Sequence, residues 1–162
     1  MKKLLTLVCM AAIATSVFAA GNLKADDCDL GTVTSKKEVK SGFTFVPEKG
    51  IVVEDKSKEP VKNGDVAYKK RIKTNGMRDA IQFSAKAGEV VTIVATSKSK
   101  DEARQLAVRD AKGKKIATMN APAWNANAPE FTSEKVTIPA DGDYIVNAAA
   151  GGGLYIFEID IK

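Results

Sequence analysis

The sequence predicts an all-β fold: an antiparallel β-sandwich, jelly-roll-like, with about 8 to 10 strands. Short segments of alternating or β-branched apolar residues recur along the chain, a pattern typical of strands with one or both faces buried. Turn residues separate these segments every 8 to 12 residues or so, a spacing common in sandwiches and barrels. Only residues 98–105 permit a helical interpretation, and that segment is too short to change the fold class.

The N-terminus has the features of a secretory signal peptide. Two lysines precede an apolar run over residues 4–14, and small residues follow at a cleavage site. We expect cleavage after Ala19, with Ala20 and Ala25 as alternatives, which gives a signal peptide over residues 1–19. The apolar run is shorter than the roughly 20 residues of a membrane span. We therefore expect a secreted protein, periplasmic or extracellular, with no membrane partner after cleavage.

A polar lead-in over residues 20–40 precedes the predicted sandwich domain, residues 41–162. Within residues 66–73, apolar and basic side chains alternate except at Lys70, which falls on the apolar side; this alternation is expected of a strand with one exposed face. The continuous β-branched run at residues 90–95 indicates a strand buried on both faces. The expected strands are residues 43–45, 51–53, 66–73, 81–83, 90–95, 104–109, 115–119, 131–138, 143–148 and 154–161.

The composition excludes most catalytic and metal chemistry. Histidine is absent, which removes the commonest general base and metal ligand. The acidic pairs at residues 26–27, 101–102 and 141/143 lie in loop or terminal sequence, where Asp and Gly serve tight turns. We therefore expect no catalytic residues, no metal and no cofactor. Without the signal peptide the basic count falls from 25 to 23 against 20 acidic residues, and this small excess does not indicate nucleic acid as a partner.

Cys28 is the single cysteine left after signal cleavage, because Cys9 lies in the apolar run. An unpaired cysteine in an exported protein indicates either a free thiol or an intermolecular bridge. A disulfide-linked dimer through Cys28 is therefore one of two alternatives.

Basic side chains on the predicted strand 66–73 form the first candidate binding site. Lys69, Arg71 and Lys73 fall on one face of this strand, about 7 Å apart because alternate residues share a face. Such a ladder suits a regularly spaced polyanion, and arginine can bind a carboxylate through two hydrogen bonds. Arg78 and Arg104 join the ladder if their strands are neighbours. The alternative is an ordinary solvated face or an edge strand protected by charge.

Trp124 is the second candidate. It lies in the loop-like segment 121–127, flanked by asparagine. An exposed tryptophan in this setting would offer a platform on which a sugar ring stacks. The alternative is a tryptophan folded over the end of the core.

Several segments resemble a known family. Val66 to Gly76 contains the Lys70-Arg71-Ile72-Lys73 strand, and Ile138 to Val146 contains a Pro-Ala-Asp-Gly-Asp-Tyr turn. In their order along the chain these segments resemble the non-catalytic β-sandwich module found beside pectate lyases and pectin esterases in bacterial pectinolytic enzymes. The resemblance covers residues 41–162, and the Lys-Arg-Ile-Lys strand is its most specific part. It implies a module that holds an enzyme near plant cell-wall polysaccharide, although no lyase domain accompanies it here.

The leading functional hypothesis is a secreted, non-catalytic carbohydrate-binding module for an acidic, pectin-like polysaccharide. The basic ladder would bind carboxylates and Trp124 would stack on sugar. The alternative is a structural or adhesive cell-envelope protein that acts through protein–protein contacts at a sheet edge or through Cys28. A small lyase is a third hypothesis, disfavoured because the chain lacks the length and repeats of a β-helix scaffold.

Overall fold

Two antiparallel sheets and a small hairpin make up the part of the chain that the computed structural model describes, residues 21–162. The predicted signal peptide lies outside these residues. The first sheet runs in the order β13 (Lys135–Thr137), β10 (Val90–Ser97), β15 (Leu154–Ile161), β8 (Lys70–Lys73), β5 (Ile51–Asp55), β2 (Gly31–Val33), and β1 (Asn22–Lys24) also pairs with β15. The second sheet runs β12 (Lys115–Ala121), β11 (Arg104–Asp110), β14 (Gly142–Ala148), β9 (Ala80–Ala85), β4 (Phe43–Val46), β3 (Lys37–Lys40). The hairpin consists of β6 (Val61–Asn63) and β7 (Val66–Tyr68).

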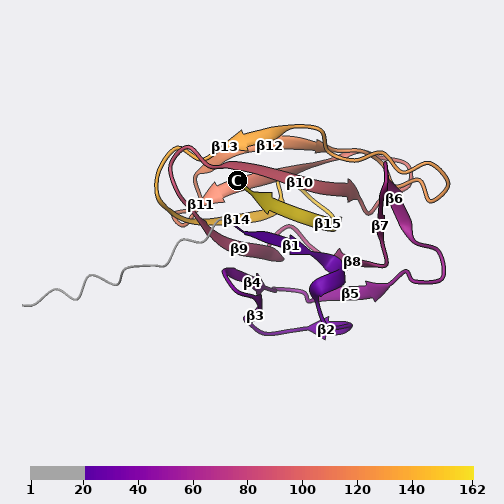
Figure 1. The fold of residues 1–162 in the computed structure, drawn as a ribbon. Helices are drawn as coiled ribbons and strands as arrows, with labels where there is room; N and C mark the ends of the chain where they lie inside the picture. Colours follow the sequence, from indigo (N-terminus) through magenta and orange to yellow (C-terminus); the bar gives the residue numbers. More distant parts are fainter. Residues whose placement is uncertain (1–20) are drawn as a thin grey trace, which may run out of the picture.

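This arrangement confirms the predicted all-β antiparallel sandwich (Figure 1). Among the described residues there are 15 short strands rather than 8 to 10, and one short 3-10 helix, η1 (Ala25–Asp27). No helix within residues 21–162 is long and apolar enough to cross a membrane.

The core lies between the two sheets and follows from the period-2 pattern of the strands. Alternate residues of β9 and β10, such as Ile81, Phe83 and Ile93, are fully or almost fully buried. Their neighbours along each strand face outward, because successive side chains of a strand point to opposite faces. The alternating buried positions are the apolar residues from which the sequence predicts these strands.

Residues 22–40 belong to the sandwich, which corrects the expected boundary at residue 41. β1 pairs with β15, β2 with β5 and β3 with β4, and Leu23 is fully buried. The segment reads as polar because β2 and β3 lie at sheet edges and are mostly exposed. The partner of β1, strand β15, lies at the far end of the chain, so the local sequence of residues 22–40 does not indicate this pairing.

The predicted strand 66–73 is divided at Lys69. The carboxylate of Asp26 accepts hydrogen bonds from the backbone N–H groups of Lys69 and Lys70, at 2.9 and 2.7 Å. These donors are therefore capped by a side chain instead of a neighbouring strand. As a result, β7 turns away into the small hairpin with β6, and only β8 remains in the first sheet.

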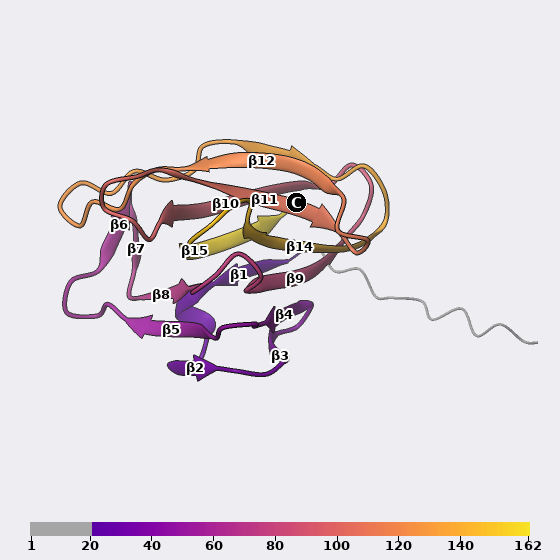
Figure 2. The same ribbon diagram turned by 180° about the vertical axis from the view of Figure 1, so that it is seen from behind.

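A second apolar cluster lies on the outer face of the first sheet. It consists of Val61, Tyr68, Trp124 and Phe157, with Val94, Phe131 and Tyr155 packed against them; we call it the outer aromatic cluster. The β6–β7 hairpin and the loop before β13 both lie at the same end of the molecule, as the two opposite views show (Figures 1 and 2).

A bulge in β15 lets this strand serve both clusters. The pairing with β10 shifts between Val94 and Ala95, so that Phe157 is the extra residue between Ile156 and Glu158. Ile156 and Ile159 point into the main core while Phe157 joins the outer aromatic cluster. A bulge of this kind re-aims side chains without breaking the strand.

Candidate functional site

Four basic side chains lie near one another: two on β8 of the first sheet, one just after β10, and one at the start of β11 in the second sheet. Arg71 and Lys73 lie on β8, on either side of the fully buried Ile72. Lys98 follows the end of β10, and Arg104 begins β11. We call Arg71, Lys73, Lys98 and Arg104 the cation cluster.

Glu54 pairs with both members of the cation cluster that lie on β8 and offsets one of their two positive charges. It stands opposite Arg71 on the neighbouring strand β5. Its Oε2 accepts from Arg71 Nε at 2.8 Å and contacts Nη2 at 2.7 Å, and its Oε1 accepts from Lys73 Nζ at 2.7 Å. Partial burial alone would raise the pKa of Glu54, but the hydrogen bonds from Lys73 and Arg71 outweigh it and lower that pKa.

Arg71 is also packed against the outer aromatic cluster. Its guanidinium carbon lies 3.6 Å from the ring centroid of Tyr155 and 5.2 Å from that of Trp124, which are cation–π distances. The side chain is only 12% exposed, and its Nη1 is buried without a hydrogen-bond partner. Arg71 is therefore held in place by stacking and by Glu54, with little surface left for a ligand.

Within residues 21–162, neither Lys98 nor Arg104 forms an ion pair with a carboxylate. Lys98 Nζ donates to Asn75 Oδ1 at 3.3 Å. Partial burial, followed by the positive charges of Lys73 and Arg104, lowers the pKa of Lys98, while Glu54 and Asp79 act in the opposite direction. Three carboxylates lie around the four cations, namely Glu54, Asp79 and, beside Arg104, Glu102, which leaves a small local excess of positive charge.

The glycine-rich segment 151–153 positions Arg104. Its Nη1 donates to the carbonyl of Gly153 at 2.9 Å. Gly152 has a φ of +76°, and a Cβ there would lie 2.1 Å from the guanidinium carbon of Arg104. Glycine is therefore required both for the backbone conformation and for the close approach of the side chain. A hollow of about 390 Å³ opens beside Arg104, lined in part by Glu102 and Gly151.

Asp79 holds the loops around the cation cluster in place. It is fully buried and accepts backbone N–H donors from Glu48 at 2.7 Å, Lys49 at 2.8 Å and Asn75 at 2.7 Å. A buried carboxylate satisfied by several backbone donors fixes the segments that supply them. Through Asn75, this support extends to Lys98.

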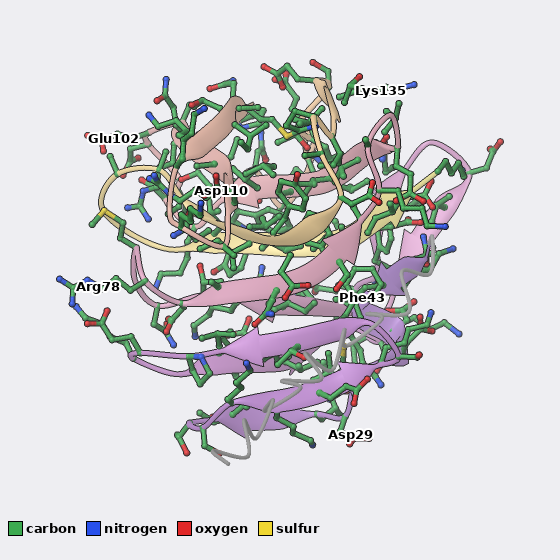
Figure 3. The ribbon with its side chains drawn as sticks, turned by 90° about the vertical axis from the view of Figure 1, so that its left-hand side faces the viewer. Asp29, Phe43, Arg78, Glu102, Asp110 and Lys135 are labelled. Atoms are coloured by element: carbon green, nitrogen blue, oxygen red, sulfur yellow. The ribbon has the colours of Figure 1, made fainter. Side chains whose placement is uncertain are left out.

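The structure brings together four of the six residues predicted from sequence: Arg71, Lys73, Arg104 and Trp124. Lys69 lies at the break between β7 and β8 and is exposed. Arg78 projects from its loop, 74% exposed, and pairs with Glu48 (Figure 3). The regular ladder of three cations on one open face is absent, because the strand divides at Lys69 and because Glu54 occupies the other two.

Trp124 is 8% exposed and lies within the outer aromatic cluster. Its ring stacks on Phe157 at 6.2 Å between centroids and meets Tyr155 edge-on at 5.4 Å. The sequence left open an exposed platform for a sugar ring or a tryptophan folded over the core, and the structure shows a buried tryptophan. It packs behind Tyr155 and Arg71 and offers no open platform for a sugar ring.

Other predicted features are structural. Asp141 accepts from the backbone N–H of Ala87 at 2.8 Å, in keeping with a turn role. No group of three or more Cys, Asp or Glu side chains converges as a metal site within residues 21–162. Cys28 is 2% exposed, and burial, with Asp27 next in effect, raises the pKa of its thiol to about 11. This buried, protonated thiol is poorly placed to link two chains, which argues against a dimer bridged by Cys28.

Comparisons with known proteins give only distant likenesses. No family model and no curated protein matches the chain. Among solved structures, the CBM22-1 xylan-binding domain from Paenibacillus barcinonensis aligns with a TM-score of 0.49 and 12% identity, over 91% of this chain and 97% of that one. A carbohydrate-binding module CBM36 in complex with calcium and xylotriose gives 0.47 and 9%, over 88% and 99%. CsCBM6-3 from Clostridium stercorarium in complex with cellobiose gives 0.39 and 11%, over 88% and 92%.

None of these three proteins is described as a partner of a pectate lyase. The expected association with pectinolytic enzymes therefore stays a prediction. The ligands named for those modules belong to them, and the chemistry of this chain rests on its own residues.

Proposed function

We propose that this protein is a secreted, non-catalytic carbohydrate-binding module whose ligand is an acidic polysaccharide. The observation that carries the proposal is the excess of positive charge in the cation cluster, where Lys98 and Arg104 lack carboxylate partners while being partly buried. A carboxylate bound there would offset the repulsion between the cations and would raise the pKa of Lys98.

The two free cations differ in what they offer a ligand. Arg104 presents a planar guanidinium held by Gly153, which suits a carboxylate bound through two nitrogen atoms. Lys98 provides a point charge with three N–H donors, one of which is held by Asn75 Oδ1, and the others can donate to a carboxylate or a hydroxyl group. A sugar acid carries both kinds of group, a carboxylate and several hydroxyls. Polyuronates such as pectin combine them along a repeating chain.

A polysaccharide fits this surface better than a nucleic acid. Single-stranded nucleic acids bind on exposed aromatic rings on which bases stack. Here Trp124 is buried, and one face of Tyr155 is covered by Arg71. The net charge after signal cleavage is also only about +3.

The test is affinity electrophoresis of the purified protein through gels containing polygalacturonate or a neutral glucan, at low and high salt. We expect retardation by polygalacturonate alone, reduced by salt because exposed charges are screened. The double variant K98A/R104A should lose this retardation. The variant K112A/K114A, which removes two exposed lysines from the β11–β12 turn, is the matched control and should behave as the wild type.

Three outcomes would count against the proposal. If neither polymer retards the protein, the proposal that it binds carbohydrate is wrong. Equal retardation by both polymers would remove the acidic specificity. Equal loss in the two double variants would remove the cation cluster as the site and leave only a general effect of net charge.

A further inference from the structure

The four edges of the two sheets are protected very unequally. β13 and β2, at the edges of the first sheet, have three residues each. β3, at one edge of the second sheet, contains Lys37, Glu38 and Lys40 within its four residues. Short length and charge are the usual means by which edge strands avoid pairing with another chain.

The fourth edge, β12, has neither protection. It is seven residues long, and after Lys115 it contains no charged residue and no proline. Its one neighbouring strand in the described part of the chain is β11. A long uncharged edge of this kind is a template for a further strand.

The backbone groups on the open side of β12 can be assigned. The N–H of Asn120 donates to the side-chain Oε1 of Glu134 at 3.2 Å, so this N–H points away from β11. Hydrogen-bonding direction alternates along an antiparallel strand, so the N–H and C=O of Thr118 point the same way. The open side is therefore covered at one residue by a side chain and is otherwise available.

We infer that β12 pairs antiparallel with β12 of a second copy of this chain, about a two-fold axis at Thr118. The charges along the edge favour this occupant. Lys115 lies at one end of β12 and Glu134 lies beside Asn120 near the other. An antiparallel pair centred on Thr118 sets Asn120 opposite Ile116 of the second copy, whose carbonyl then replaces Glu134 as the acceptor of the Asn120 N–H. Lys115 of each copy lies at the end where the displaced Glu134 of the other copy lies. Two opposite-charge pairs then form by symmetry.

The side chains agree with this arrangement. Thr118 and Asn120 are exposed. The alternate residues Met119 and Ala121 are buried in the core of their own copy. In the pair, Thr118 faces Thr118 of the second copy, and threonine pairs across neighbouring strands are favourable. The six-stranded sheet of each copy would continue into the other.

The test uses cysteine cross-linking and sedimentation. In a hydrogen-bonded antiparallel pair, opposite Cα atoms lie about 5.5 Å apart, which a disulfide can span. We expect Thr118→Cys to form a covalent dimer with oxidised glutathione. Lys37→Cys, on the charged edge β3, should stay monomeric, and the native Cys28 is buried in both.

Thr118→Lys is the second variant, because it places like charges opposite each other across the axis. We expect wild-type protein to double its mass with rising concentration in sedimentation, and Thr118→Lys to remain a monomer. Gln105→Lys adds the same charge at an exposed residue of β11, away from the edge, and should still dimerise. A wild-type monomer at every concentration with no cross-link in Thr118→Cys would overturn the inference. A dimer that survives Thr118→Lys would also overturn it, by placing the contact elsewhere.

Discussion

Glu54 offers the sharpest test of how the cation cluster works, because its removal should affect stability and binding in opposite directions. In Glu54→Gln the amide keeps the size of the side chain but loses the charge that pairs with Arg71 and Lys73. Hydrogen bonds to charged groups contribute about 1.5 to 3 kcal/mol each to stability. Since Glu54 is 24% exposed and Arg71 12%, water will replace part of what is lost, and we expect a net loss of about 2 kcal/mol. For a domain of this length the melting temperature should fall by roughly 4 to 8 °C.

Binding should improve in the same variant. Loss of one carboxylate adds one unit of positive charge to the cluster and frees Lys73 for a ligand. A unit charge about 6 Å from a ligand carboxylate contributes about 0.7 kcal/mol in water, which corresponds to an approximately threefold gain in affinity for polygalacturonate.

Thermal unfolding and affinity electrophoresis on the same samples measure the two effects. Glu48→Gln is the control, because Glu48 also pairs with an arginine, the exposed Arg78, and exposed pairs contribute little to stability. It should leave both quantities near the wild-type values. A Glu54→Gln protein that loses affinity as well as stability would refute the reasoning, since Glu54 would then be contacting the ligand or shaping its site.

Two further predictions concern Gly152 and Cys28. Gly152→Ala should cost about 1 to 2 kcal/mol, because its φ is positive and its Cβ would strike Arg104, and it should weaken binding. Gly142→Ala, where a Cβ has nothing within 4 Å, should change neither; an intact affinity in Gly152→Ala would mean that Arg104 is dispensable. For Cys28, burial raises the thiol pKa from 9.0 to about 11, so its contribution to stability is fully present below pH 9 and is lost as the pH rises through 11. Between pH 8 and 11 the free energy of unfolding, measured by denaturation, should therefore fall by about 2 kcal/mol more for wild type than for Cys28→Ala. An equal fall in the two proteins would show that the thiol does not titrate in this way.

The alternation of side chains was enough to predict the sandwich, since burial on one face is a local property of each strand. Strand partners are not local. Nothing near Asp26 in the sequence indicates that its carboxylate caps Lys69 and Lys70 and divides the predicted strand. The same limit applies to Leu23, whose partner strand β15 ends the chain.

The candidate site was predicted in part for the same reason. The basic residues of β8 were evident, but the register that sets Glu54 opposite Arg71 is a property of the folded sheet. Lys98 was missed altogether, although its position just after the long strand 90–95 in a Ser-Lys-Ser-Lys run is a signal that it lies at a strand end. A tryptophan in a loop gave no indication of its burial, because the residues that cover Trp124 come from distant parts of the chain.

The position of Trp124 also gives the protein an internal fluorophore. It is the only tryptophan in the sequence, and its indole lies 5.2 Å from the guanidinium carbon of Arg71. Indole emission depends on the polarity and charge of its immediate surroundings. Any event that moves Arg71, whether release from Glu54 or occupation of the neighbouring cations by a ligand, should therefore change the emission spectrum of the unlabelled protein. Unfolding would change it too, but with the red shift that accompanies exposure of the ring to water, so the two processes can be followed separately in a single cuvette.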